Sequence, residues 1–256
     1  MFRRAIVRPP SANFADGLTT ANLGAPDHRL ALAQHAAYVE ALTRCGLDVI
    51  RLPEDPRHPD ATFVEDTAVI TPRAAILTRP GAPSRADEVA GIRTALAPWH
   101  PAPLEIEAPG TLDGGDVCET DRGFVIGISA RTNEEGAAQL ARHLAAHGAA
   151  STFVDVRGVE GILHLKSGIA SLGDGRVAAI GALAGHPALR GYEVVAVAPE
   201  ESYAANCVRV NGRVLVAAGF PRFERSLRAL GHETLALDVS EFAKMDGGLS
   251  CLSLRF

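Results

Sequence analysis

Apolar residues along the chain form short runs with two-residue spacing and longer stretches with helical spacing, separated by glycine and proline. The short runs predict strands and the longer periodic stretches predict helices. The predicted helices cover residues 27–45, 84–97, 132–148 and 221–231, and a short, weak helix is expected near residues 187–190. The predicted strands cover residues 5–7, 48–52, 63–70, 75–78, 104–106, 111–119, 124–128, 152–156, 193–197, 206–210, 214–218, 234–237 and 251–256, with a hairpin between residues 164 and 180.

Several predicted helices have residues that are typical of helix ends. Asp27 is placed to cap the first helix, and Gly46 is placed to end it. Thr132 and Glu135 have the spacing of a capping box at the start of the third helix. Pro98 ends the second helix because proline cannot continue the helical hydrogen bonding.

The predicted elements repeat along the chain as strand, strand, helix and strand. The pattern occurs five times if the strand at residues 251–256 pairs with the strand at residues 5–7 and completes the first repeat from both chain ends. Repeats of about 40–50 residues are typical of propellers and stacked arrays, in which equivalent positions face a common axis. The sequence therefore predicts an α/β protein with one domain over residues 1–256.

The predicted first strand of each repeat has a polar or reactive residue at or near its start. Successive members are separated by 48, 51, 42 and 45 residues; they are Glu65, Asp113, His164, Asn206 and Cys251. An array that turns equivalent positions toward one axis would bring two acids, an imidazole, an amide and a thiol together. Strand starts are often polar in any protein, but this alternative does not explain why these residue types could act together in one site.

Composition and charge narrow the class of protein. At 256 residues and 47% hydrophobic content, the chain can bury a full core without a metal or disulfide staple. A net charge of −5 with scattered Lys and Arg offers no basic surface for nucleic acid. The four cysteines are far apart, as in proteins with reduced intracellular thiols, and no apolar run suits a signal peptide or a membrane span. We expect a cytoplasmic protein without nucleic-acid or membrane partners.

Cys251 is the candidate nucleophile. It follows a glycine-rich bend, Asp246-Gly247-Gly248, which lets the backbone approach a ligand closely. A thiolate is a strong nucleophile when a histidine or a nearby charge takes its proton, and His164 is the natural partner. Asp113 can orient that imidazole or bind a cationic substrate. Alternatively, Cys251 is an ordinary core cysteine and Asp113 belongs to a strand bulge.

Acidic residues in the second repeat favour a cationic ligand. Asp60 and the adjacent pair Glu65 and Asp66 would repel one another on a half-buried strand unless a cation compensates them. A guanidinium is the cation that pairs best with carboxylates, because it donates two parallel hydrogen bonds. Arg85 and Arg131, at the entries of the second and third predicted helices, are candidates for a substrate carboxylate unless they are ordinary surface arginines.

Seven short motifs occur in order along nearly the whole chain. They are Gly17-Leu18-Thr19, Pro59-Asp60 with Phe63-Val64-Glu65-Asp66, Leu112-Asp113-Gly114-Gly115-Asp116, Ala130-Arg131-Thr132-Asn133, Leu163-His164-Leu165-Lys166, Ala204-Ala205-Asn206-Cys207 and Asp246-Gly247-Gly248-Leu249-Ser250-Cys251. Together these motifs resemble dimethylarginine dimethylaminohydrolases, and the resemblance runs essentially end to end. It implies a pentein fold, a five-bladed α/β propeller with pseudo-fivefold symmetry.

The resemblance implies a role for each candidate residue. Cys251 would attack the guanidinium carbon of an Nω-methylated arginine, and His164 would protonate the departing amine and then activate water. The substrate-binding residues would be Asp113 and Asp66, with the Glu65 backbone or side chain, for the guanidinium, Arg85 and Arg131 for the α-carboxylate, Asp60 and the Leu18 carbonyl for the α-amino group, and the backbone at Met245 and Asp246. The resemblance implies no cofactor, and zinc would bind only as an inhibitor. It leaves open a homodimer.

Two positions bear on which guanidine is processed. Asp113 is within the family's range, since some relatives have Glu there. Related arginine deiminases usually have an acid two residues after the histidine, where this chain has Lys166. Unless Lys166 points outward, the missing carboxylate leaves room for a methylated nitrogen and favours methylarginine over arginine. An arginine deiminase-like hydrolase and a non-catalytic guanidine-binding pentein are the alternatives.

Overall fold

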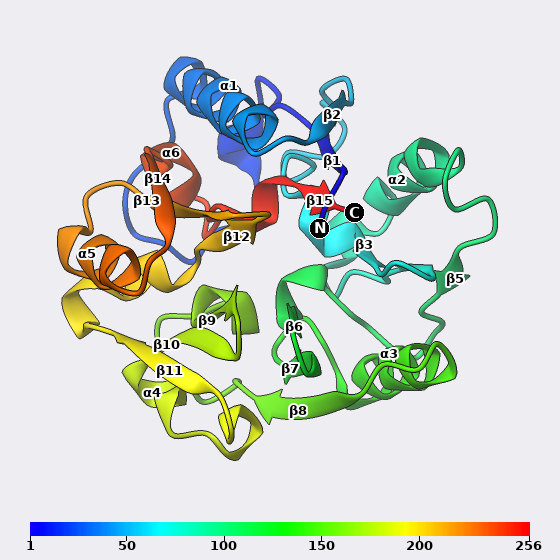
Figure 1. Ribbon diagram of the computed structural model, residues 1–256. Helices are drawn as coiled ribbons and strands as arrows, with labels where there is room; N and C mark the ends of the chain where they lie inside the picture. The colour runs from blue at the N-terminus through cyan, green and yellow to red at the C-terminus, as the bar shows by residue number, and fades with distance from the viewer. The chain divides into compact units, whose positions relative to one another are not determined.

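The computed structural model describes residues 1–256 and contains two compact units (Figure 1). The first consists of residues 1–64 and 206–256, and the second of residues 65–205. The first contains two three-stranded sheets and the second contains three. In every sheet the middle strand pairs antiparallel with one neighbour and parallel with the other. The three strands of each predicted repeat therefore form one sheet.

The first unit contains both ends of the chain. The C-terminal strand pairs with the N-terminal strand, as predicted, and the pairing is antiparallel with Ala5 opposite Arg255. The elements are β1 (Arg4–Val7), η1 (Phe14–Asp16), α1 (His28–Arg44), β2 (Asp48–Arg51), β12 (Val208–Val210), β13 (Arg213–Ala217), α5 (Pro221–Ala229), β14 (Glu233–Leu237), α6 (Ser240–Ala243), η8 (Ser250–Leu252) and β15 (Leu254–Arg255), where η denotes a 3-10 turn.

An aromatic cluster anchors the loops of the first unit. Phe14, Phe63 and Phe242 lie with ring centroids 5.6–6.3 Å apart, two pairs tilted and the Phe63–Phe242 pair edge-to-face, a geometry that aromatic pairs prefer. Asp27 caps α1 by accepting a hydrogen bond from the Leu30 N–H, as predicted from the sequence. Burial of these rings fixes the segments that carry the candidate residues of this unit.

The second unit contains three sheets and two longer helices. Its elements are η2 (Val64–Thr67), which begins at the unit boundary, β3 (Ala68–Ile70), β4 (Ala75–Leu77), η3 (Pro83–Arg85), α2 (Glu88–Leu96), β5 (Leu104–Glu105), η4 (Gly114–Asp116), β6 (Val117–Thr120), β7 (Gly123–Ile128), α3 (Glu134–Ala146), β8 (Ser151–Asp155), η5 (Leu165–Ser167), β9 (Ile169–Gly173), β10 (Arg176–Ile180), α4 (Gly181–Ala184), η6 (Pro187–Leu189), β11 (Glu193–Val197) and η7 (Pro199–Ala205). Leu140 and Leu144 of α3 pack against Ile76 of β4 and Ile126 of β7 in a buried cluster.

The structure corrects the start of each repeat. The sequence predicted strands from residues 63, 111, 164, 206 and 251, but at four of these places a 3-10 turn precedes the strand, and at residue 206 such a turn has just ended. Short apolar runs do not distinguish such a turn from a strand, because a 3-10 turn lasts only three or four residues. The turns matter for function because they carry the candidate residues.

Two helix starts also differ from the prediction. The cap of α3 is Asn133, whose side chain accepts from the Gly136 N–H, and the Thr132 hydroxyl instead donates to Asp116. The predicted helix from residue 84 is divided into η3 and α2, so Arg85 lies in the turn before the helix. The weak helix near residues 187–190 is the 3-10 turn η6.

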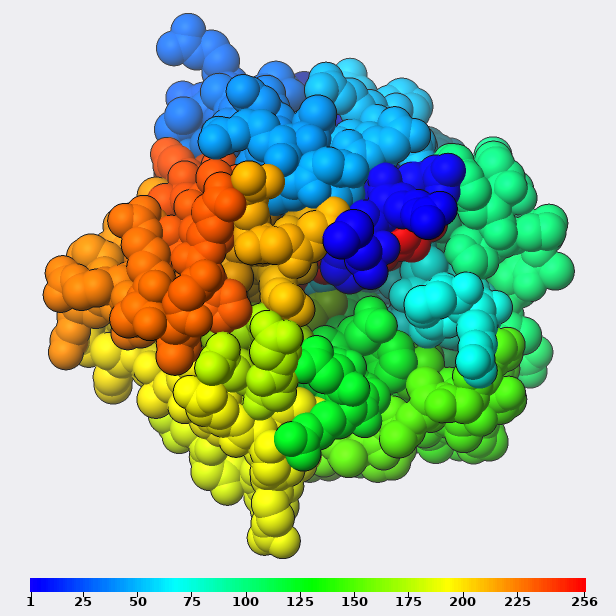
Figure 2. Space-filling view, in the orientation of Figure 1, coloured from blue at the N-terminus to red at the C-terminus, as the bar shows by residue number.

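The segment that joins η1 to α1 lies at the surface of the first unit. Residues 18–25 are exposed except Ala21. The N-terminal residues, the darkest blue atoms in Figure 2, also lie at the surface. Leu18 and Leu23 are exposed apolar side chains in this segment. None of the helices combines the length and the apolar content needed to cross a bilayer.

Candidate active site

The 3-10 turns of the second unit hold one another through buried carboxylates. Asp66, the third residue of η2, accepts a hydrogen bond of 2.9 Å from the Gly115 N–H in η4. Asp116, the third residue of η4, accepts one of 2.9 Å from the Leu165 N–H in η5. Each carboxylate therefore fixes the backbone of the next turn. Ser129 and Thr132 hydroxyls also donate to Asp116, at 2.7 and 2.6 Å.

Gly114 and Gly115 let these turns approach closely. A Cβ at Gly114 would overlap the Glu65 carbonyl oxygen. A Cβ at Gly115 would lie 2.8 Å from Cγ and Nδ1 of His164 and 2.9 Å from Oδ1 of Asp66. Because real Cβ contacts are not this short, only glycine permits this packing.

His164 and Asp113 form a buried pair. His164 Nε2 lies 3.0 Å from Asp113 Oδ2, and the Gly81 N–H donates to Asp113 Oδ1 at 2.8 Å. Burial disfavours the imidazolium, but the negative charges of Asp66, Asp116 and Asp113 outweigh this and raise the pKa of His164 to about 9. His164 is therefore protonated at neutral pH and can donate a proton.

Arg85 lies in a buried ion-pair network with Asp66 and Glu88. Its Nη1 lies 2.6 Å from Asp66 Oδ2, and its Nε and Nη2 bind Glu88 at 2.8–3.2 Å. Burial disfavours ionisation of Asp66, but the charges of Arg85 and His164 outweigh it and hold the pKa of Asp66 below its usual value. The sequence predicted Arg85 as a ligand of the substrate carboxylate, whereas here all three guanidinium nitrogens bind protein carboxylates.

We expect Arg85→Met to lower the free energy of unfolding by about 3–5 kcal/mol, because it leaves two buried carboxylates without their cation. Arg93→Met is the matched control, since Arg93 pairs with Glu105 at the surface and such pairs contribute at most about 1 kcal/mol. Urea unfolding followed by circular dichroism measures both. Equal losses in the two variants would contradict the assigned strength of the buried network.

Lys166 pairs with Glu65 and does not point outward. Lys166 Nζ lies 2.6 Å from Glu65 Oε1, and the two side chains are 15% and 5% exposed. One of the two adjacent acids of the second repeat is thus neutralised by this lysine, while Asp66 is neutralised by Arg85. The repulsion that the sequence predicted between adjacent carboxylates is relieved by protein cations on both sides.

A cation could also be considered at Asp66, Asp113 and His164, since one ligand atom from each lies within 4.8 Å of the others. Both carboxylates and the imidazole already have partners in the network. A metal would have to displace Arg85 from Asp66 or a proton from His164. The arrangement therefore fits a charge-stabilised acid better than an open metal site.

Arg131 lies outside the network that holds Arg85. Its side chain is half-buried, and its backbone lies against Gly81, where a Cβ would overlap the Arg131 carbonyl oxygen. Gly81 in turn donates to Asp113, so the turn that carries Arg131 is next to the Asp113–His164 pair. This geometry makes Arg131 the better candidate for an incoming carboxylate.

In the first unit, the predicted residues Leu18, Asp60 and Met245 lie close together. The Leu18 N–H donates to both carboxylate oxygens of Asp60, at 3.1 Å each. A Cβ at Gly17 would overlap Asp60 Oδ1 and lie 3.2 Å from Met245 Cε, so glycine allows this loop to close on both. Asp246 Oδ2 accepts from the N–H and hydroxyl of Thr20 and holds the same loop.

Cys251 is buried, 8% exposed, on the 3-10 turn η8. Its N–H donates to the Gly248 carbonyl at 3.2 Å, and its Sγ lies 3.9 Å from Ser250 Oγ. Asn206 binds Ser250 through both atoms of its amide, at 2.9 and 3.2 Å. Cys251 is thus a buried thiol on a short turn held from a distant part of the chain.

Comparison with known proteins decides the family. The family model for arginine deiminase matches residues 56–167. The chain is 44% identical over 257 residues to N(G),N(G)-dimethylarginine dimethylaminohydrolase of Pseudomonas aeruginosa, and the alignment covers all of both chains. The chain belongs to the dimethylarginine dimethylaminohydrolase family. It is also 39% identical over 254 residues to the enzyme of that name from Streptomyces coelicolor, covering 99% of this chain and 96% of the relative.

Solved structures of the family match the whole chain. A cysteine-to-serine mutant from Pseudomonas aeruginosa, complexed with citrulline, matches with a TM-score of 0.96, 44% identity and complete coverage of both chains. A histidine-to-glycine variant of a dimethylarginine dimethylaminohydrolase, an adduct with S-methyl-L-thiocitrulline, matches equally well, with the same TM-score of 0.96. The predicted pentein fold is confirmed. A cyanobacterial arginine dihydrolase domain shares this fold at a TM-score of 0.87 with only 16% identity, covering 100% of this chain and 97% of that domain.

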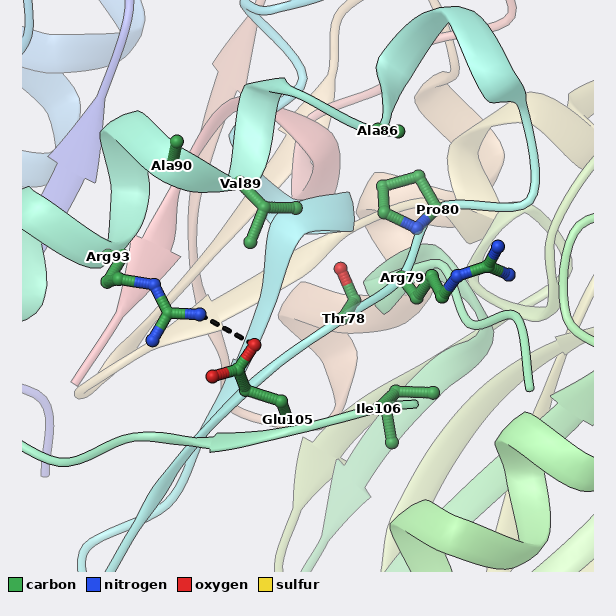
Figure 3. A pocket seen from close by; sticks show the side chains of 9 residues that line it. All are labelled: Thr78, Arg79, Pro80, Ala86, Val89, Ala90, Arg93, Glu105 and Ile106. Atoms are coloured by element: carbon green, nitrogen blue, oxygen red, sulfur yellow. Dashed lines mark ion pairs between the residues drawn. The ribbon is translucent and has the colours of Figure 1, made fainter. Parts of the chain in front are cut away.

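A separate hollow in the second unit is not lined by any predicted residue of the family site. Its volume is about 290 Å³, and the Arg93–Glu105 ion pair, 2.6 Å long, lies at its edge (Figure 3). The lining residues are Thr78, Arg79, Pro80, Ala86, Val89, Ala90, Arg93, Glu105 and Ile106. The concentration of buried ionisable groups, and not this hollow, marks the candidate site.

Two residues of the network were missed from the sequence. Glu88 follows Arg85 by three residues, a spacing at which side chains on a helical turn meet, so this partner could have been found. Asp116 binds a backbone N–H 49 residues away, and no local signal reveals such a bond. Both residues hold the neighbours of the candidate acid.

Proposed function

We propose that the protein is a hydrolase that converts Nω-methylated L-arginine to L-citrulline and releases dimethylamine from the asymmetric dimethyl substrate or methylamine from the monomethyl substrate. Membership of the dimethylarginine dimethylaminohydrolase family supports this reaction. The observation that carries the proposal is the buried Asp113–His164 pair, with the pKa of His164 raised to about 9. Such an imidazolium can protonate an amine as its bond to carbon breaks.

In the first half of the reaction, the Cys251 thiolate attacks the guanidinium carbon and forms a C–S bond. The C–N bond to the methylated nitrogen then breaks, and His164 gives its proton to the departing amine. A thiouronium intermediate remains on Cys251. Asp113 stabilises the imidazolium before the transfer and orients the ring, since it accepts the hydrogen bond from Nε2.

In the second half, His164 has become a neutral imidazole and can act as a base. It takes a proton from water, whose oxygen attacks the thiouronium carbon. The C–S bond breaks, the second proton of the water leaves the new urea oxygen for solvent, where the released amine can take it up, and citrulline leaves Cys251 as a thiolate. One histidine therefore serves as the acid in the first half and as the base in the second.

We propose the substrate contacts as expected from the sequence, with one adjustment. Asp66, Asp113 and the backbone of Glu65, whose side chain is paired with Lys166, hold the guanidinium. Asp60 with the Leu18 carbonyl holds the α-amino group. Arg131 binds the α-carboxylate directly, while Arg85 contributes its charge from the buried pairs with its acids. The backbone at Met245 and Asp246 completes the set.

We further propose that the two compact units form one catalytic domain over residues 1–256, which alignment over the whole length of a single-chain relative supports. The reaction as written uses only side chains and water, so we propose that it needs no cofactor and that zinc acts only as an inhibitor. Small methylated arginines are the partners. A cytoplasmic location and a homodimer stay predictions.

The proposal is tested by product release from asymmetric dimethylarginine, monomethylarginine and arginine in parallel. We expect citrulline with dimethylamine or methylamine from the methylated substrates and little ammonia from arginine. Lys166 favours this outcome because it occupies Glu65, which leaves no second carboxylate free at this position for an unsubstituted nitrogen. Ammonia as the main product would establish the deiminase alternative, and tight binding without citrulline would establish a non-catalytic binding protein.

We expect Arg131→Ala to raise KM for asymmetric dimethylarginine by about 10- to 100-fold with little change in kcat. Its charge-assisted bonds would be made equally in the ground state and the transition state, and losing such uniform binding changes KM alone. Steady-state kinetics measure the effect, with Arg79→Ala, another arginine of the second unit, as the control. A fall in kcat with unchanged KM would contradict carboxylate binding.

A further inference from the structure

We propose that Asn206 is a positioning residue for Cys251 and acts through Ser250. The proposal rests on the proposed role of Cys251 as the nucleophile. Asn206 directly follows η7, and Ser250 directly precedes the nucleophile, 44 residues later in the chain. Both side chains are buried, with exposures of 6% and 3%.

The amide of Asn206 binds both polar groups of Ser250. Its Oδ1 accepts from the Ser250 N–H at 2.9 Å, and its Nδ2 donates to Ser250 Oγ at 3.2 Å. The turn also closes directly over the amide, because a Cβ at Gly248 would lie 2.6 Å from Asn206 Cγ. Gly248 is the residue whose carbonyl accepts from the Cys251 N–H. Asn206 is therefore enclosed by the turn that carries the thiol.

This turn needs an external support. A three-residue 3-10 helix has one or two internal hydrogen bonds of poor geometry and little stability of its own. The direction of Cys251 Sγ depends on the dihedral angles of this turn, and an attacking atom displaced by about 1 Å can lose about a hundredfold in rate. The two bonds from Asn206 fix the residue next to Cys251 and so fix the direction of attack.

Only an amide makes both bonds as they stand. An aspartate at position 206 could accept from the Ser250 N–H but could not donate to Ser250 Oγ, so the Ser250 hydroxyl would have to rotate and donate to it. It would also place a negative charge beside the turn and raise the pKa of the Cys251 thiol. Alanine would leave the buried N–H without an acceptor. Alanine therefore tests the geometric support of the turn, and aspartate tests the electrostatic effect on the thiol.

Gln34 provides a matched control in the same unit. It is buried, 5% exposed, and its amide accepts from the Glu241 N–H at 3.1 Å and donates to Ser240 Oγ at 2.9 Å. It thus holds the start of α6 by the same pair of bonds that Asn206 makes to η8. Removing either amide disturbs a turn, but only one turn carries Cys251.

The test compares Asn206→Ala, Asn206→Asp and Gln34→Ala in the full chain. Kinetics with asymmetric dimethylarginine are measured together with the pH dependence of iodoacetamide labelling at Cys251, read by peptide mass spectrometry. We expect Asn206→Ala to lower kcat by about 10- to 100-fold with KM changed less than about threefold. Asn206→Asp should shift Cys251 labelling to higher pH, and Gln34→Ala should change neither quantity.

The proposal is overturned if Asn206→Ala keeps the parent kcat or if Gln34→Ala loses as much. If Asn206→Ala fails to fold, Asn206→Asp decides the matter, because an unshifted labelling profile overturns the electrostatic link. If the parent protein releases no citrulline, the proposed function fails, but the labelling profiles still test whether Asn206 governs the thiol. The two failures are therefore distinguishable.

Discussion

Purified Cys251→Ser protein should release no citrulline from asymmetric dimethylarginine, with a fall in kcat of at least about a thousandfold. A serine hydroxyl is far less ionised than a thiol at neutral pH, and it lacks the nucleophilicity of sulfur. The turn η8 should keep its shape, because serine is close to cysteine in size and the Cys251 N–H still reaches Gly248. Loss of rate without loss of binding is the expected signature.

Calorimetric titration with citrulline and a colorimetric assay for its release together measure this signature. Cys45→Ser is the control, since Cys45 is another buried, free thiol in the first unit, at the end of α1. It should keep the parent rate. Substantial citrulline release by Cys251→Ser, or equal loss in both variants, would remove Cys251 from the role of nucleophile.

His164→Gln should lower kcat by about a hundredfold to ten-thousandfold, the usual range for removing a general acid and base. Because His164 serves both halves of the proposed reaction, a poorly basic leaving group should let the first half proceed while the second stalls. S-methyl-L-thiocitrulline supplies such a group, and intact-protein mass spectrometry should then detect a covalent adduct on Cys251. A full turnover rate without the imidazole would contradict both assigned roles.

The pH dependence gives an independent check on His164. Since its pKa is raised from 6.5 to about 9, the acid form should persist at neutral pH and kcat should fall as pH rises through about 9. The same shift stabilises the folded protein fully below about pH 6.5, and that contribution disappears as pH rises through about 9. Asp113→Asn removes one raising charge, so the alkaline limb should move to lower pH. If the alkaline limb of the kcat profile stays at the same pH in Asp113→Asn, a group other than His164 is responsible for it.

The sequence predicted the repeats well because their signals are local. The apolar run in β13 and the capping Asp27 of α1 are visible within a few neighbouring residues. The 3-10 turns were missed because bonds such as Asp66 to Gly115 join residues 49 positions apart. Without those bonds, the residues around Glu65 have the pattern of a strand start.

The candidate site was predicted from a set of residue types, which does not reveal how the members pair. Lys166 and Glu65 are 101 residues apart, and only the fold brings Nζ to within 2.6 Å of the carboxylate. Arg85 was expected to be free for substrate because its partner Glu88 was not recognised on the next turn. The packing of the folded chain decides which cations are already paired with protein carboxylates, and the sequence alone does not show this.

The ion-pair network of the second unit also bears on how the product leaves. Its formal charges are five carboxylates, Glu65, Asp66, Glu88, Asp113 and Asp116, and three cations, Arg85, Lys166 and protonated His164, a net charge of −2. A guanidinium offsets part of this negative charge, whereas the urea group of citrulline carries no charge. Turnover therefore exchanges a ligand that offsets the buried charge for one that does not, and the site itself weakens its hold on the product.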